Sequence, residues 1–351
     1  MKILVTRTDR LGDLVLSLPV WAGLKAACRD WEIHVMVAPG AVPLVENDPH
    51  LERIWTWHDE MTTDETAALV AELVAAGFEA VVMLQYRRQL ATMLRSAGIK
   101  LRYGPWSKWT SWFHLNRGVR QNRSAGEQHE MDFNIQLGRR VVADLGDRDE
   151  NDIVWPAPRL VLTPDQELGT RDFQVEYAPG SSQSIFIHPG SGGSALNWEP
   201  ARFAAVANAL AEAANCRIFV TGAGADAQVL EQVTPTLVPA VTVLQDRFDL
   251  RQFLAVLAAG HLFIGPSTGP LHLAAALGVP TLGLFPPVRT MNPDRWGPRG
   301  YATAAPMNIM PDLTCPARRL CSQERCRFYN CLQEISVETV VSAARKILSQ
   351  G

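Results

Sequence analysis

The stretch that decides the fold is Leu262-Phe-Ile-Gly-Pro-Ser-Thr-Gly-Pro-Leu-His-Leu-Ala-Ala-Ala-Leu-Gly-Val-Pro-Thr-Leu-Gly-Leu-Phe-Pro286, which contains no Asp, Glu, Lys or Arg. It predicts in turn a buried strand, a tight turn, a helix and a second buried strand, at 262–264, 265–269, 270–277 and 281–285. Its polar side chains, Ser267, Thr268 and His272, gather at the turn. A small-residue turn ahead of a helix leaves the first helical N–H groups unpaired, which suits an anion such as phosphate. An ordinary strand–turn–helix of a buried core has the same pattern, so both interpretations stay open at this point.

Strands and helices alternate in the same way along the rest of the chain. Apolar and β-branched runs predict further strands at 2–7, 32–37, 53–55, 80–84, 99–103, 184–188, 217–221 and 241–244. Helical patterns predict helices at 14–28, 63–76, 87–97, 128–144, 200–215, 226–233, 250–259 and 337–349. This alternation is typical of parallel, doubly wound sheets, so we expect an α/β fold. Pro19 should kink the first helix or mark the place where it restarts.

Length and composition indicate two domains. The 351 residues are enough for two cores, and the polar, proline-containing stretch 146–184 is expected to connect them. A formal net charge of −3 gives no reason to expect nucleic acid as a partner. The first ten residues hold too short an apolar run for a signal peptide, and the Gly and Pro residues of 262–286 argue against a membrane span. We therefore expect a cytoplasmic protein.

Four of the six cysteines gather near the end of the chain, at Cys315, Cys321, Cys326 and Cys331. Such a cluster could bind zinc or an iron–sulfur cluster, but the close C-x-x-C pairs typical of those sites are absent. Reduced thiols in a C-terminal loop are the expected state in a cytoplasmic protein, and no metal ligand is assigned. Cys28 and Cys216 stand alone in apolar patterns and are expected to be core thiols.

The segment 87–123 departs from the average composition of the chain. It contains nine Arg and Lys residues and no Asp or Glu, and the basic residues are interleaved with Tyr103, Trp106, Trp109, Trp112 and Phe113. A cationic surface with aromatic side chains suits a phosphorylated glycolipid, a membrane surface or nucleic acid. The other interpretation is a solvated face whose counter-charges come from elsewhere in the fold. We favour the first, because nine charges of one sign are difficult to neutralise locally.

Three turns are expected at the carboxyl ends of strands, where α/β sheets bind ligands, at 8–13, 190–194 and 267–269. Two of them lie in the second half and are rich in small residues, which suits one pyrophosphate held between two sets of backbone N–H groups. The dinucleotide and P-loop glycine patterns are absent there, so a dehydrogenase or a P-loop NTPase is not supported. In the first turn Asp13 is either a helix cap or a general base that removes a proton from an acceptor hydroxyl.

Three motifs carry a resemblance to a known family. They are Arg7-Thr-Asp-Arg-Leu-Gly-Asp-Leu-Val-Leu-Ser-Leu-Pro19, His188-Pro-Gly-Ser-Gly-Gly-Ser194 with Asn197-Trp198, and Gly265-Pro-Ser-Thr-Gly-Pro-Leu-His-Leu-Ala-Ala-Ala-Leu-Gly278. Together they resemble glycosyltransferase family 9, the ADP-heptose:lipopolysaccharide heptosyltransferase family. The motifs occur in the family's order and span nearly the whole chain. The cysteine cluster followed by an Ile-Ser-Val-Glu helix is also similar to the family.

The resemblance implies a GT-B fold, in which two Rossmann-like domains face each other across a cleft. It implies an acceptor-binding domain, a nucleotide-sugar-binding domain and a last helix that packs back on the first domain, at 1–165, 166–333 and 334–351. Asp13 matches the family's catalytic base. The donor-binding positions implied are Ser191, Gly192, Gly193, Ser194, Asp226, Ser267, Thr268, Gly269 and His272. For an anionic acceptor of the lipid A/Kdo type we expect Arg10, Arg87, Arg88 and Arg120.

The implied reaction is inverting transfer of a heptose, or a related sugar, from an ADP-sugar to the lipopolysaccharide inner core. The protein would contact the cytoplasmic face of the inner membrane peripherally. Backbone N–H groups at 191–194 and 267–269 would stabilise the leaving diphosphate. The resemblance therefore implies no cofactor and no metal, with the ADP-sugar as the donor substrate.

Two positions depart from the family's pattern. Leu196 stands where a Lys is often found two residues before the Trp, and Ser267 stands where an Asp often precedes Thr-Gly. Loss of a cation near the diphosphate can remove on the order of 3 kcal/mol of leaving-group stabilisation. Arg7, Arg10 or a mobile side chain could replace that cation. Otherwise the donor is another nucleotide-sugar, the chain is a weak enzyme, or it binds nucleotide-sugars without catalysis; a dehydrogenase is the most distant alternative.

Overall fold

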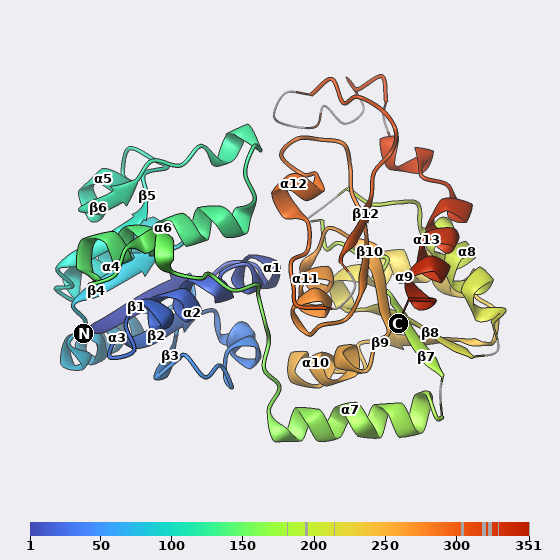
Figure 1. The fold of residues 1–351 in the computed structure, drawn as a ribbon, viewed down its shortest axis with the longest axis horizontal. Helices are drawn as coiled ribbons and strands as arrows, with labels where there is room; N and C mark the ends of the chain where they lie inside the picture. The colour runs from blue at the N-terminus through green and yellow to red at the C-terminus, as the bar shows by residue number, and fades with distance from the viewer. Residues whose placement is uncertain are drawn as a thin grey trace. The chain divides into compact units, whose positions relative to one another are not determined.

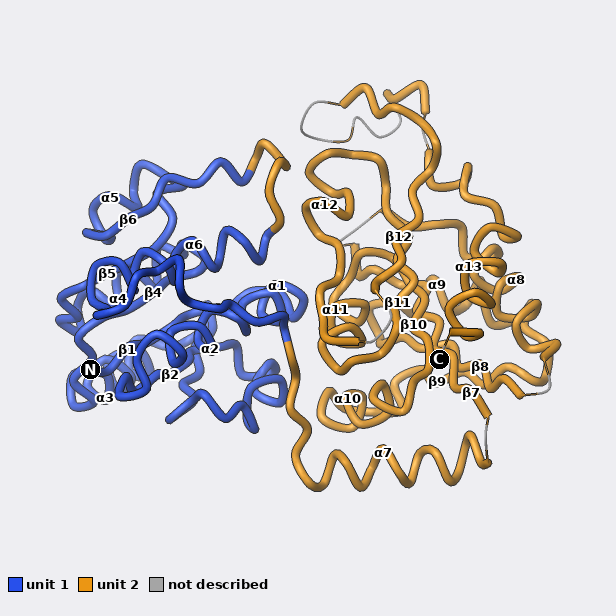
Figure 2. Tube along the Cα trace, in the orientation of Figure 1, with its two compact units in different colours: residues 1–123, 130–158 blue, residues 124–129, 159–351 orange. Residues whose placement is uncertain are grey.

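The computed structural model describes residues 1–180, 182–193, 196–213, 215–302, 305–317, 321, 325–328 and 330–350. The chain forms two compact units (Figure 2): unit 1 comprises residues 1–123 and 130–158, and unit 2 comprises residues 124–129 and 159–351. The boundary expected at 165 is therefore corrected to 158. Its physical reason is that Leu160 already donates its N–H to the carbonyl of Ala276, at 2.8 Å, within unit 2.

The short segment 124–129 belongs to unit 2 although unit 1 continues on both sides of it. Gly126 has a left-handed φ of 65°, and a Cβ there would lie 2.5 Å from the carbonyl oxygen of Arg289. Glu127 pairs with the Arg289 guanidinium, and His129 Nε2 lies 2.8 Å from the carbonyl oxygen of Gly297. These contacts explain why the segment is part of unit 2.

Unit 1 is built on a six-stranded parallel sheet in the order β3-β2-β1-β4-β5-β6 (Figure 1). Its strands are β1 (Lys2–Arg7), β2 (Glu32–Val37), β3 (Arg53–Thr56), β4 (Ala80–Met83), β5 (Leu101–Pro105) and β6 (Arg117–Val119). Its helices are α1 (Leu11–Val15), α2 (Leu18–Ala27), α3 (Thr63–Ala76), α4 (Arg88–Ser96), α5 (Ser111–His114) and α6 (Glu130–Leu145).

Unit 2 has a second six-stranded parallel sheet, in the order β12-β11-β10-β7-β8-β9. Its strands are β7 (Gln183–Ile187), β8 (Cys216–Gly222), β9 (Val241–Gln245), β10 (Leu262–Pro266), β11 (Thr281–Leu284) and β12 (Met307–Ile309). Its helices are α7 (Pro164–Tyr177), α8 (Pro200–Ala211), α9 (Ala227–Val233), α10 (Leu250–Ala258), α11 (Gly269–Ala276), α12 (Pro293–Trp296) and α13 (Val337–Leu348).

The two sheets have the same topology when the strands of each are counted from its own first strand. In both, the order is 3-2-1-4-5-6, which is the Rossmann order. The connections reverse direction between the first and fourth strands, so each unit has a switch point there: between β1 and β4 in unit 1 and between β7 and β10 in unit 2. The expected α/β GT-B fold class, with two Rossmann-like domains, is confirmed.

Several element predictions need correction. The helix expected at 14–28 is two helices: α1 begins at Leu11, and the chain restarts as α2 with Pro19 in its first turn, as that proline predicts. The region 146–184 contains the 14-residue helix α7, and the tail after 291 contains α12 and the edge strand β12. Neither α5 nor β6 was predicted.

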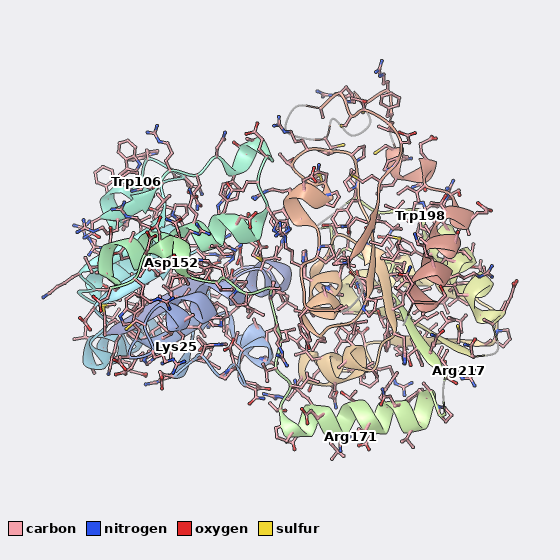
Figure 3. All side chains as sticks on the ribbon, viewed as in Figure 1. Lys25, Trp106, Asp152, Arg171, Trp198 and Arg217 are labelled. Atoms are coloured by element: carbon pink, nitrogen blue, oxygen red, sulfur yellow. The ribbon has the colours of Figure 1, made fainter. Side chains whose placement is uncertain are left out.

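The last helix also lies elsewhere than the resemblance implied. The apolar face of α13, formed by Val340, Val341, Ala344 and Ile347, is part of the hydrophobic core of unit 2 and packs against α8. Just before it, the indole Nε1 of Trp198 donates to the carbonyl of Ile335 at 3.1 Å (Trp198 is labelled in Figure 3). The expected packing of this helix on the N-terminal domain is therefore wrong for its apolar face. Within the part of the chain that is described, no helix is both long enough and apolar enough to cross a membrane.

Candidate active site

Charged side chains fill the switch point of unit 1. Arg7 ends β1, and its buried guanidinium contacts three carboxylates. The Nε atom donates to Asp9 Oδ1 at 2.6 Å, a terminal nitrogen donates to Asp13, and the other lies 3.5 Å from Glu130 Oε1. Burial alone would lower the pKa of Arg7, but the three carboxylates raise it above its usual range. All the nitrogens of the Arg7 guanidinium thus face carboxylates of unit 1. This corrects the prediction that Arg7 could supply the positive charge near the donor diphosphate in place of the Lys that Leu196 replaces.

Asp13 lies in the first turn of α1 and does not cap it. The N-cap residue is Arg10, which makes no side-chain cap hydrogen bond. One carboxylate oxygen of Asp13 accepts a hydrogen bond from Arg7, and its side chain remains 15% exposed. The interpretation of Asp13 as a simple helix cap is therefore wrong. A partly exposed carboxylate held in one orientation can accept a proton from a bound hydroxyl.

The electrostatics of the site favour a base that works near neutral pH. Burial raises the pKa of Asp13 to about 6; Arg7 and Arg10 lower it, whereas the negative charges of Asp9 and Glu130 raise it further. Above that pH the carboxylate is ionised and can take a proton. Its basicity is higher than that of an ordinary aspartate, which makes proton transfer from a sugar hydroxyl easier.

A second layer of polar groups surrounds Arg7. Arg123 donates to Glu130, and both Arg7 and Arg123 donate to Asn134 Oδ1, at 3.2 and 3.4 Å. The amide nitrogen of Asn134 donates to the carbonyl of Leu16, just after α1. These residues fix the position of α1 and its carboxylate. The sequence prediction missed Glu130 and Asn134, and their signal is polar side chains on the otherwise apolar buried face of α6.

The candidate acceptor residues of unit 1 lie at one edge of its sheet. Arg10, Arg87 and Arg120 follow β1, β4 and β6, and Arg88 opens α4. The carboxyl ends of parallel strands share one edge, so the topology brings these segments to the same side as Asp13. Arg87 pairs with Asp59 and lies 5.8 Å from the Trp57 ring. The other three are exposed, and no carboxylate of the described residues forms an ion pair with any of them.

At the switch point of unit 2, a glycine-rich turn follows β7. Gly192 and Gly193 adopt left-handed φ angles of 50° and 74°, which L side chains rarely adopt. A Cβ on Gly190 would lie 2.0 Å from Asp226 Oδ1. Ser191 is half-buried within the same turn, and Ser194 lies outside the described residues.

Asp226 positions this turn. Its Oδ1 accepts from the backbone N–H of Gly192 at 3.3 Å, and its Oδ2 accepts from that of Ala223 at 3.2 Å. The side chain is buried, with His188 Nε2 3.6 Å away; burial keeps the pKa of His188 below its ordinary value despite this neighbouring carboxylate. Asp226 thus holds the glycine-rich turn through both of its carboxylate oxygens.

The second turn of unit 2 joins β10 to α11. Thr268 is the N-cap residue in an extended conformation, but it makes no side-chain cap hydrogen bond. Ser267 is half-buried, and Gly269 is the first residue of α11. The first N–H groups of α11 are thus not capped by Thr268, which leaves them suited to an anion.

His272 adds a neutral polar group to the same turn. It is almost completely buried in α11, and its Nδ1 has no hydrogen-bond partner among the described residues. Burial, helped by the nearby His129, lowers the pKa of His272 to about 3. The imidazole is therefore uncharged at neutral pH. A buried ring nitrogen without a partner is costly, so a ligand that supplies one gains free energy there.

The structure brings the two turns of unit 2 together. Strands β7 and β10 are neighbours in the sheet, and the His188 N–H donates to the carbonyl of Ile264 at 2.9 Å. Residues 191–193 and 267–269 therefore follow adjacent parallel strands and lie at the same edge of the sheet. Two sets of backbone N–H groups next to each other can bind the two phosphates of a nucleotide diphosphate.

Leu196 has a structural role in unit 2. It packs against the core and lines a cavity of about 70 Å³ together with Asn197 and the four clustered cysteines. Burial raises the pKa of Cys331, and the other three cysteines raise it further. All six cysteines are free thiols; Cys216 is buried and Cys28 half-buried. Within the described ranges, no three His, Cys, Asp or Glu side chains are arranged to hold a metal ion.

Comparisons with known proteins show the family and the fold. The sequence profile described as glycosyltransferase family 9 (heptosyltransferase) matches residues 66–321. A Haemophilus influenzae protein with a provisional glycosyltransferase name is 30% identical over 303 residues, which is 85% of this chain and 86% of that protein.

Two solved structures share the fold of the whole chain. The crystal structure of a family 9 glycosyltransferase from Veillonella parvula has a TM-score of 0.82 at 19% identity, and covers 100% of this chain and 98% of its own. The structure of the ADP-heptose lipopolysaccharide heptosyltransferase II from Escherichia coli has a TM-score of 0.78 at 21% identity, with 100% and 99% covered.

Proposed function

The chain belongs to glycosyltransferase family 9, and from that premise we propose that it transfers a heptose, or a closely related sugar, from an ADP-sugar to the lipopolysaccharide inner core. The observation that carries the proposal is Asp13, a fixed and partly exposed carboxylate with a pKa of about 6 at the switch point of unit 1. A protein that only binds a nucleotide-sugar has no need of such a base. The ADP-heptose named for the Escherichia coli structure indicates the donor class.

In the proposed reaction Asp13 takes the proton of an acceptor hydroxyl. The hydroxyl oxygen forms a bond to the anomeric carbon from the face opposite the nucleotide. The bond between that carbon and the diphosphate oxygen breaks, and ADP leaves with the electron pair. The anomeric configuration is therefore inverted. The proton ends on the Asp13 carboxyl, from which it passes to water.

Unit 2 would bind the donor and stabilise the leaving diphosphate. The backbone N–H groups of Ser191 and Gly193 and those of Ser267, Thr268 and Gly269 are the proposed ligands. Gly192 donates its own N–H to Asp226, which holds the first turn, and His272 donates or accepts one neutral hydrogen bond. Ser194 completes the proposed phosphate turn by resemblance. Arg10, Arg87, Arg88 and Arg120 are the proposed contacts to the anionic acceptor.

A second candidate is a family 9 transferase that uses a different nucleotide-sugar. The observations that favour it are Leu196, whose side chain packs in unit 2 where a Lys is often found, and Ser267 in place of an acid. With Arg7 fully engaged by carboxylates, Arg10 is the remaining candidate of unit 1 to supply the missing positive charge.

The experiment uses the purified full chain with a Kdo-containing lipid A acceptor and a panel of nucleotide-sugars that includes ADP-heptose. We expect ADP release and an acceptor heavier by one heptose, detected by mass spectrometry. Transfer from another member of the panel but not from ADP-heptose would establish the second candidate. Tight ADP binding without any sugar transfer from the panel would contradict both and identify a binding protein.

A further inference from the structure

The helix α5 and the turn before it expose an unusual set of aromatic side chains on unit 1. Trp109, Phe113 and Trp112 are 76%, 63% and 62% exposed, and Trp106 is 39% exposed. Every exposed Trp or Phe in the described part of the chain belongs to this group. Figure 3 shows Trp106 at the outer side of unit 1. A contiguous patch of exposed large apolar side chains, unlike a single one, marks a surface that interacts with a partner or a membrane.

The aromatic residues contact one another, which makes them one patch. The rings of Trp109 and Phe113 meet edge to face with centroids 5.9 Å apart, and those of Trp106 and Trp112 are also 5.9 Å apart. Trp106 lies directly on the backbone of Gly118 in β6, where a Cβ would come within 1.8 Å of the indole. The patch therefore has a defined shape.

Polar contacts attach α5 to neighbouring elements of unit 1, while its aromatic side chains are exposed. Ser111, the first residue of α5, and Leu115, the residue after it, are buried. The two ring nitrogens of His114 lie 3.0 Å from Tyr86 Oη and 3.1 Å from Thr92 Oγ1, on the inner side. The Arg95 guanidinium donates to the carbonyl of Phe113 at 2.8 Å. The backbone of these residues is therefore well bonded to unit 1, so their exposure does not come from a lack of local contacts.

Positive charge accompanies the patch. Three of the nine basic residues of 87–123 find carboxylates from outside the segment, since Asp59, Asp144 and Glu130 pair with Arg87, Arg117 and Arg123. Lys108 and Arg95, which lie beside the aromatic residues, are exposed and form no ion pair with a carboxylate of the described residues. The local field is thus positive although the whole chain has a net charge of −3.

We propose that α5 and the turn before it anchor the protein to a bilayer with anionic headgroups. Trp109, Trp112 and Phe113 enter the interfacial layer, where amphipathic rings are most stable, and Lys108 and Arg95 contact the headgroup phosphates. The inference deepens the proposed function, since a lipid-linked acceptor lies in such a bilayer, but its test needs neither donor nor acceptor.

The test measures co-sedimentation of the full chain with vesicles of phosphatidylcholine, with and without phosphatidylglycerol. We expect binding to the anionic vesicles that weakens with salt, and quenching of tryptophan fluorescence by brominated lipid. The triple variant Trp109→Ser, Trp112→Ser, Phe113→Ser should lose at least about tenfold in partition, because each buried ring contributes apolar transfer free energy. Lys108→Glu should weaken binding to the anionic vesicles alone.

A matched control removes exposed apolar side chains elsewhere: Val154→Ser, Leu168→Ser, Val175→Ser, which replaces residues 79%, 57% and 76% exposed. It should sediment as the unsubstituted chain does. The proposal is overturned if the unsubstituted chain does not bind vesicles, if both triple variants bind equally, or if the patch instead forms a dimer that light scattering detects and the Trp/Phe variant abolishes. Vesicle binding without any sugar transfer would refute the proposed function and leave the anchor standing.

Discussion

The switch point of unit 1, between β1 and β4, and that of unit 2, between β7 and β10, occupy the same place in the same strand order. The residues at the two switch points differ in kind: those of unit 1 are charged, and those in the two turns of unit 2 are small and uncharged. In unit 1, two arginines, Arg7 and Arg123, meet three carboxylates, one of which is that of Asp13. In unit 2, the two turns present glycine, serine and threonine, and their histidines are held neutral by burial.

The difference teaches how one fold divides a transfer reaction. A carboxylate placed among buried charges has a shifted pKa and can move a proton. Turns made of small residues expose backbone N–H groups, which bind phosphates without a proton of their own. In the proposed function unit 1 therefore takes the proton and unit 2 stabilises the leaving group, and substitutions confined to one unit can test each role.

The largest expected effect is on turnover. Asp13→Asn keeps the size of the side chain but removes the proton acceptor, so kcat should fall by about 10²–10⁴-fold. Binding of the ADP-sugar, measured by calorimetry, should stay within about twofold, because unit 2 is untouched. The matched control is Asp9→Asn, which removes another carboxylate from the same Arg7 guanidinium. A comparable loss in the two variants, or near-normal turnover of Asp13→Asn, would show that Asp13 is not the base.

The next effect is on donor affinity. Gly190→Ala places a Cβ against Asp226, which cannot move away because both of its oxygens hold backbone N–H groups. The turn must shift, and the loss of one or two hydrogen bonds to the diphosphate should weaken ADP-sugar binding by about 10–100-fold. Gly40→Ala is the control, since nothing lies within 4 Å of its Cβ position. Unchanged affinity in Gly190→Ala would remove this turn from the donor site.

Much of this comparison can be read from the sequence, because the features involved are local. The strands at both switch points and the small-residue turns after them are fixed by consecutive residues. The helix α7 also left a local signal: Thr163 and Gln166 form a capping box around Pro164. The helix was not predicted because its apolar pattern is weak: only Gln166 and Phe173 are buried. The three-residue edge strand β12 is too short to show any period.

The environment of Asp13 could not be read from the sequence in the same way. Glu130 and Asn134 come from α6, more than a hundred positions along the chain, and reach Arg7 only because the sheet places α6 beside it. A pattern search sees their residue types but not their partners. For the same reason Arg7 looked available for the donor, and the structure shows it surrounded by carboxylates.

The pH dependence should differ between the two units. Because the pKa of Asp13 is about 6, its protonated form predominates below that pH, and log kcat/KM should fall by about one unit for each pH unit of acidification. Binding of the ADP-sugar should not follow this fall, because burial lowers the pKa of both histidines at the donor turns, that of His188 below its ordinary value and that of His272 to about 3, and the diphosphate has no proton to lose near neutral pH. If binding of the ADP-sugar weakened at acid pH in the same way, the titrating group would belong to unit 2 and not be Asp13.

The smallest effect is a shift of the acid limb of the pH–rate profile, the pH range in which kcat/KM falls. The Glu130 charge raises the pKa of Asp13, so Glu130→Gln should lower it and extend activity toward acid by about half a pH unit. The released Arg7 acts in the same direction, because one fewer carboxylate shares its charge. Asp132→Asn is the control: it removes one negative charge from the same turn of α6, but Asp132 is not one of the main groups that shift the Asp13 pKa. The position of the limb separates this effect from a mere loss of folded protein, which lowers the rate at every pH. A shift toward alkaline pH, or the same shift in both variants, would show that Glu130 does not tune the base.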